Sequence, residues 1–142
     1  MTRHTDIFPA ELIQEAYYAC GPLPPSGKMH SYAIFHHEID GNPPRTISNS
    51  IDVGYSPVNV ANIRAMDIFL RDWPLFTQRD FYKKAPGDPH ENRLVSWHLT
   101  EDSELHLEIY DHNGALWHVL YVELWSTFDR PIGSFLPVDI PI

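Results

Sequence analysis

Apolar and polar residues alternate with a period of two between Leu94 and Trp125. Alternation of this kind predicts strands, because successive side chains of a strand point to opposite faces of its sheet. Two turn signals interrupt the pattern, at Glu101-Asp102-Ser103 and at Asn113-Gly114, and Asn-Gly is typical of a tight hairpin turn. We therefore expect three consecutive antiparallel strands in this segment.

Both turns predict the same division of residues between the two faces of this sheet. The first turn pairs Leu99 with Leu105, and the second pairs Leu107 with Leu120. Because the two registers agree, one face is predicted to be an aliphatic core. Its members are Val95, Trp97, Leu99, Leu105, Leu107, Ile109, Leu116, Leu120 and Val122.

The opposite face of the same strands carries histidine and aromatic side chains where a solvated face would carry small polar ones. His98 is predicted to lie across from His106, His106 across from Tyr121, and Tyr110 across from Trp117. An aromatic floor with a few polar groups is typical of a binding cleft. The full set is Leu94, Ser96, His98, His106, Glu108, Tyr110, Trp117, Val119 and Tyr121.

The first half of the chain supplies two helices and a hairpin. A helical period predicts a helix over 6–20, whose apolar face ends at a buried Cys20. Alternation predicts strands over 30–39 and 46–55, joined by a turn. Ser56 is predicted to cap a second helix, with Pro57 at its first position.

Three other segments complete the chain. The second helix is predicted to run to about Trp73, with Met66 and Phe69 on its buried side. Residues 75–91 are predicted to be irregular. The tail from Ser126 contains several prolines, which cannot donate to a sheet, so we expect an extended wrap there.

This order of elements, α-β-β-α-β-β-β, predicts a single α+β domain over 1–142. We expect a curved antiparallel sheet of about five strands with two helices packed on it. The order is similar to that of the cone-shaped NTF2-like domains, although the long paired amino-terminal helices usual in that family are not evident. The likeness concerns the order of elements and brings no residues with it.

Charge and cysteine content narrow the range of partners. The formal net charge of −9 argues against duplex nucleic acid and anionic membranes, which both attract basic surfaces. A single cysteine excludes an internal disulfide and fits a reducing cytoplasm. No apolar run is long enough to span a bilayer, and no apolar leader is present, so we expect neither a spanning helix nor a signal peptide.

The polar cluster of the second face allows three interpretations. His98, His106 and Glu108 could ligate a metal, but their spacing matches no known signature, and we expect no cofactor. Acid–base chemistry could use the same residues together with Tyr121. The third interpretation is structural, with local hydrogen bonds and ring contacts between neighbouring strands.

Two functional hypotheses follow. The first is a small cytoplasmic binding protein that captures a basic protein, in the manner of bacterial immunity proteins, using aromatic anchors and acidic edges. These binding residues are Tyr110, Trp117, Trp125, Glu101, Asp102, Glu104 and Asp111. The alternative is a small-ligand enzyme, an isomerase, dehydratase or hydrolase, whose cleft is roofed by the second helix or the tail. The sequence leaves the oligomeric state open.

Overall fold

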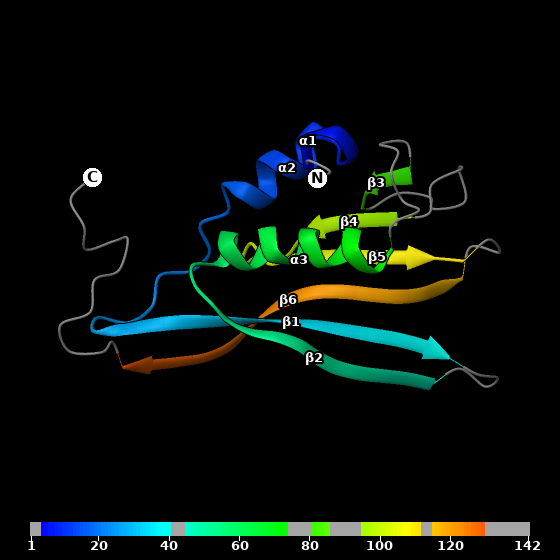
Figure 1. Cartoon of the computed structure of the whole chain (residues 1–142). Helices are drawn as coiled ribbons and strands as arrows, with labels where there is room; N and C mark the ends of the chain where they lie inside the picture. Colours follow the sequence, from blue (N-terminus) through cyan, green and yellow to red (C-terminus); the bar gives the residue numbers. More distant parts are fainter. Residues whose placement is uncertain (1–3, 41–44, 74–80, 86–94, 112–114, 130–142) are drawn as a thin grey trace.

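The computed structural model describes residues 4–40, 45–73, 81–85, 95–111 and 115–129. Within them, six strands form one open sheet and three helices pack on one of its faces (Figure 1). The helices are α1 (His4–Ile7), α2 (Ala10–Tyr17) and α3 (Val58–Asp72). The strands are β1 (Lys28–Asp40), β2 (Arg45–Tyr55), β3 (Tyr82–Lys84), β4 (Val95–Leu99), β5 (Leu105–Tyr110) and β6 (Leu116–Asp129).

The strand order is β2-β1-β6-β5-β4-β3, and every neighbouring pair is antiparallel except β3 with β4. The α+β class is therefore confirmed, and the expected antiparallel sheet gains a sixth, parallel strand at its edge. The prediction that residues 75–91 are irregular missed this strand, because three residues are too few to show a period-two alternation. Residues 74–80, 86–94 and the tail from 130 lie outside the described residues, so the predictions for them stay predictions.

The predicted amino-terminal helix is in fact two short helices. Pro9 separates them, because proline has no N–H and cannot continue the helix that precedes it. The predicted cap, Asp6, lies inside α1. The chain leaves α2 after Tyr17, so Cys20 is exposed rather than buried.

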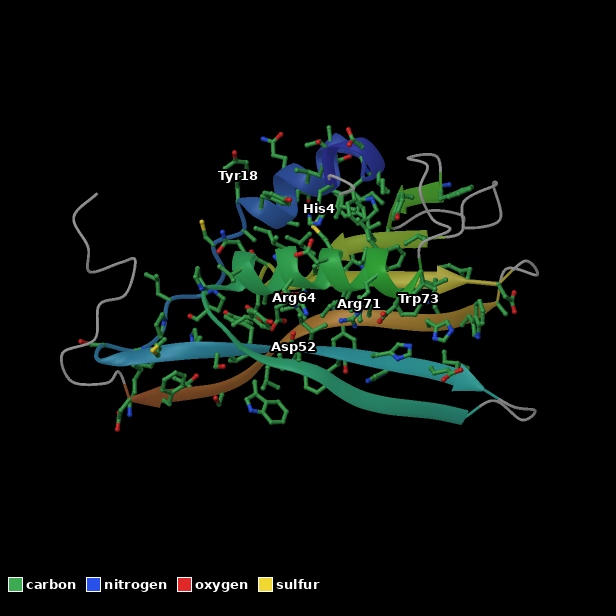
Figure 2. All side chains as sticks on the ribbon, viewed as in Figure 1. His4, Tyr18, Asp52, Arg64, Arg71 and Trp73 are labelled. Carbon is green, nitrogen blue, oxygen red and sulfur yellow. The ribbon has the colours of Figure 1, made fainter. Side chains whose placement is uncertain are left out.

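A histidine ties α1 to the rest of the helical layer (Figure 2). Nε2 of His4 lies 2.6 Å from a carboxylate oxygen of Asp67 on α3. Its Nδ1 lies 2.5 Å from the hydroxyl of Tyr17 on α2. One side chain therefore connects all three described helices.

Helix α3, the second helix of the sequence prediction, starts later than predicted. Pro57 holds the N-cap position in an extended conformation, no side chain caps the helix, and α3 begins at Val58. The prediction that Ser56 is the cap is therefore wrong. Met66 and Phe69 are buried as predicted, whereas Trp73 is only partly buried at the C-cap.

The register of the last three strands is confirmed by the structure. Leu99 pairs with Leu105, and Leu107 pairs with Leu120, as the two turns predict. A register shift after Ile109 changes one pair, so that Tyr110 faces Leu116 instead of Trp117. The Asn113-Gly114 turn itself lies outside the described residues.

The hydrophobic core lies between the three helices and the aliphatic face of β4, β5 and β6. Asn62 of α3 is a polar residue within it. Its Nδ2 donates to the carbonyls of Ala16 and Ser103, and its Oδ1 accepts the N–H of Leu105 at 3.0 Å. The side chain therefore joins α2, α3 and the β4–β5 hairpin, and all of its groups are used.

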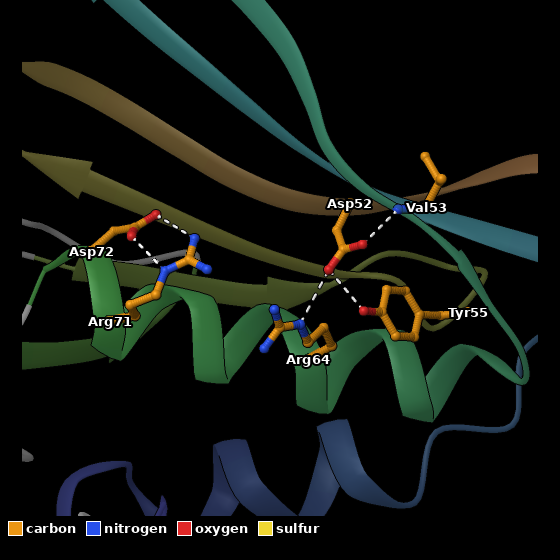
Figure 3. Close-up of polar contacts among 6 residues, drawn as sticks. All are labelled: Asp52, Val53, Tyr55, Arg64, Arg71 and Asp72. Carbon is orange, nitrogen blue, oxygen red and sulfur yellow. Dashed lines mark hydrogen bonds and ion pairs between the residues drawn. The ribbon is translucent and has the colours of Figure 1, made fainter.

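A second polar anchor joins α3 to β2, as Figure 3 shows. Nε of Arg64 donates to Oδ2 of Asp52 at 3.1 Å, and the Tyr55 hydroxyl donates to the same oxygen at 2.7 Å. Burial alone would raise the pKa of Asp52, but these hydrogen bonds and that from the Val53 N–H lower it overall. Arg71 lies two turns further along α3 and instead pairs with its neighbour Asp72.

Candidate functional site

The histidine and aromatic face of the sheet lies on the side away from the helices. The residues that α3 buries pack with the aliphatic side chains of β4, β5 and β6. The expectation that α3 roofs the histidine face is therefore wrong, because the helix covers the opposite side (Figure 1). No described helix covers the histidine face, and the tail that we expected as another roof lies outside the described residues.

Five rings form a continuous line across β1, β6, β5 and β4, which we name the aromatic row. In order its members are Trp125, Phe35, Tyr121, His106 and His98. The successive ring centroids are 5.9, 5.4, 5.0 and 5.0 Å apart, within the range of favourable aromatic contacts. The structure thus brings together three of the four residues proposed for acid–base chemistry.

The fourth residue, Glu108, lies beside the aromatic row. Its Oε1 is 3.9 Å from Nδ1 of His98, too far for a hydrogen bond, and its Oε2 accepts from the Tyr110 hydroxyl at 3.0 Å. Nδ1 of His98 is a buried atom without a hydrogen-bond partner among the described residues. On the other side of the row, the Tyr121 hydroxyl and Nε2 of His37 are 2.7 Å apart.

Burial keeps His106 and Tyr121 of the row, and the neighbouring Tyr110, uncharged at neutral pH. Burial, together with the nearby His98 and His37, lowers the pKa of His106 to about 4. Burial and the adjacent Glu108 raise the pKa of Tyr110 to about 12, and burial and Glu123 raise the pKa of Tyr121. These groups are therefore suited to stacking and neutral hydrogen bonding at pH 7.

An open groove runs along one side of the aromatic row. It is lined by His37, Thr100, Glu104, His106, Val119, Tyr121, Val122 and Glu123. Within the described part of the chain, no three histidine, cysteine or acidic side chains gather closely enough to hold a metal ion. The described residues therefore offer a hydrogen-bonding and stacking surface, but not a ligand set for a metal.

The acidic residues predicted to line this face differ in their exposure. Glu101 and Asp102 are exposed at the β4–β5 turn, as expected. Glu104 is only 9% exposed, and its carboxylate accepts from the Leu124 N–H at 2.7 Å. Asp111 is partly buried and accepts the N–H of Ala115. Glu104, which the sequence analysis assigned to the binding residues, is therefore largely buried, and its carboxylate accepts from the backbone of β6.

The two tryptophans proposed as anchors lie apart. Trp125 is 55% exposed at a bulge of β6, where it ends the aromatic row next to Phe35. Trp117 is 45% exposed at the other end of the strand, against His118. Trp125 is thus part of the row, whereas Trp117 is a separate exposed side chain.

Sequence reasoning missed the contribution of β1 to the site. Phe35 and His37 lie on one face of that strand, which the alternation over 30–39 already indicated. The missing information was that β1 pairs with β6, which places Phe35 opposite Tyr121. That pairing adds a ring and an imidazole to the face.

A second histidine pair lies on the helix side of the sheet. Nε2 of His36 is 2.8 Å from Nδ1 of His118, and Trp73 packs against both rings. Burial lowers the pKa of His36 and, together with His36, that of His118. The pair thus packs against the C-cap residue of α3, Trp73.

Comparisons of the chain with models of protein families, with curated proteins and with solved structures found no match. None of the described helices has the length and apolar character needed to cross a membrane.

Proposed function

We propose that this chain is a binding protein that captures a basic protein partner on the sheet face opposite its helices. The observation that carries the proposal is the aromatic row, a line of five rings on a face that no described helix covers. Aromatic side chains supply large contact area at low entropic cost and are frequent anchors of protein interfaces. The single cysteine supports a cytoplasmic setting for this activity.

Charge supports a basic partner. Strands β4, β5 and β6 contain no lysine or arginine, and the whole chain has a net charge of −9. Glu123 and Thr100 both line the groove beside the row. The two residues that come after Thr100 in the sequence, Glu101 and Asp102, are exposed. An acidic rim of this kind steers a basic surface toward the face and determines its orientation.

A small-ligand enzyme is the second candidate. The buried Nδ1 of His98, which lacks a partner among the described residues and lies 3.9 Å from Glu108, favours it. The groove is open, however, and His106 makes no hydrogen bond within the described residues that would orient it as a base.

Affinity capture from a lysate of the host of origin tests the first candidate. The immobilised wild-type chain is compared with Trp125→Ala, which shortens the aromatic row, and with a double variant, Glu101→Lys with Asp102→Lys. Tyr18→Ala is the matched control, because Tyr18 is 78% exposed on the helical side of the molecule (Figure 2).

We expect one basic protein to be retained by the wild type and by Tyr18→Ala. Its retention should fall with Trp125→Ala, and should fall with the double variant and with rising salt. Retention of the same protein by all four chains would show that binding does not use this face. Selective loss of activity toward a small substrate in His98→Ala would instead favour the enzyme.

A further inference from the structure

A cavity of about 400 Å³ opens at the end of the sheet near the amino terminus of α3. The segment 20–27 forms one wall, and the start of β1 and the residues before α3 form the others. Its lining includes Cys20, Leu23, Met29, Tyr32, Pro57 and Val58, and is mostly apolar. Volume and lining are typical of a site for a small molecule.

Tyr32 supplies one of the polar groups of this cavity. The residue is 2% exposed, and its hydroxyl has no hydrogen-bond partner among the described residues. Because Tyr32 lines the cavity, its hydroxyl can donate a hydrogen bond to a molecule bound there.

The chain leaves space beside the hydroxyl by placing a glycine there. Gly21 has φ +65°, and a Cβ on it would lie 3.3 Å from the Tyr32 hydroxyl oxygen and 3.0 Å from Cγ1 of Val58. A side chain at Gly21 would therefore be strained and would crowd both residues.

The surroundings of Tyr32 disfavour an anion. Burial is the main cause that raises the pKa of Tyr32, and the nearby Glu104 and Asp102 raise it further. A tyrosine hydroxyl is protonated at pH 7 even at its ordinary pKa, so it can donate, and the two carboxyl groups near it disfavour a bound anion. Lys28 lines the cavity, but its ammonium pairs with Asp129. His30 also lines it, and its Nδ1 is 2.8 Å from the Thr127 hydroxyl.

We propose that this cavity binds a small, uncharged and largely apolar molecule that carries a carbonyl or similar acceptor for the Tyr32 hydroxyl. The apolar lining would enclose most of the ligand, and the hydroxyl would set its orientation. The site shares no lining residue with the aromatic row, so it is separate from the proposed protein-binding face.

Three naphthalene dyes test the proposal by fluorescence titration. Prodan is neutral and carries a carbonyl, N-phenyl-1-naphthylamine is neutral and lacks one, and 8-anilinonaphthalene-1-sulfonate adds a negative charge to the second dye. We expect saturable binding of one equivalent of prodan. The sulfonate should bind at least roughly tenfold more weakly than its neutral counterpart, because of the negative potential around Tyr32.

Tyr32→Phe removes only the hydroxyl. It should weaken prodan binding roughly three- to tenfold, as expected for one lost hydrogen bond, and leave N-phenyl-1-naphthylamine binding unchanged. Leu23→Ala, at an exposed side chain of the wall, should weaken both neutral dyes without affecting the fold. Trp125→Ala is the control and should bind the dyes as the wild type does.

Alkylation of Cys20 gives an independent readout, because it is the only cysteine and lines the cavity. A saturating concentration of prodan should slow the reaction of Cys20 with N-ethylmaleimide, as measured by intact mass. Absence of saturable binding would overturn the proposal. So would binding that is lost in Trp125→Ala, or binding that neither protects Cys20 nor responds to Tyr32→Phe. The capture experiment on the aromatic row can fail without affecting these results.

Discussion

His36 and His118 form an imidazole pair across β1 and β6, with Nε2 of His36 2.8 Å from Nδ1 of His118. In such a pair one ring donates and the other accepts, so both rings cannot be protonated while the bond is kept. Burial lowers the pKa of both, while the carboxylate of Glu38 partly opposes this for each ring. Because the folded pKa values are depressed, the stabilisation is present above the ordinary histidine value and is lost as pH falls.

We expect His36→Leu to lower the free energy of unfolding by about 1 to 2 kcal/mol at pH 7.5, because it leaves His118 buried without this partner. The loss should be smaller at pH 5, where the wild-type pair is itself weakened. Urea denaturation at the two pH values measures both effects. An equal loss at both values would show that the pair does not respond to protonation.

His106→Phe should make the protein less sensitive to acid. The pKa of His106 is lowered from 6.5 to about 4, so protonating it in acid costs the folded state about 3 kcal/mol relative to pH 7. The protein therefore loses stability as pH falls from 6.5 to 4. Phenylalanine keeps the ring contacts with His98 and Tyr121 but cannot be protonated, so thermal unfolding should show a flatter pH dependence. Parallel curves for the two proteins would contradict this account.

Asn62→Ala should be among the most destabilising polar substitutions in the described core. It removes the hydrogen-bond partners of Ala16, Ser103 and Leu105, and we expect a loss of about 3 kcal/mol or more. Asn59→Ala is the matched control, because Asn59 makes a single bond to the Tyr17 carbonyl and should cost about 1 kcal/mol. Similar losses for the two variants, measured by chemical denaturation, would refute the joining role of Asn62.

Glu104 should behave as a structural rather than a partner-binding acid. Burial raises its pKa, so its contribution to stability is complete below its ordinary value and declines as pH rises through the folded value. Glu104→Gln keeps an acceptor for the Leu124 N–H and should be as stable as the wild type, or more so, at pH 7. Glu104→Ala should lose about 1 to 2 kcal/mol, because the Leu124 N–H loses its acceptor. A stable alanine variant in a melting experiment would count against this role.

Local patterns predicted the last three strands well. The turn after Leu99 and the pairing of Leu107 with Leu120 follow from period-two alternation and turn residues that are close in sequence. The same patterns failed at Pro9 and Ser56, where the backbone conformation of a proline determines where a helix begins. They also failed at Tyr110, because a register shift is a local irregularity that alternation does not show.

The amino-acid sequence determined which side chains share a face of β4, β5 and β6, because that division depends only on alternation and short turns. The tertiary structure decided which face the helices cover, and so left His98, His106 and Tyr121 on the other side. It also decided that β1 lies beside β6, which joins His37 to Tyr121 across 84 residues of chain. Such contacts depend on long-range packing between elements, which no local pattern records.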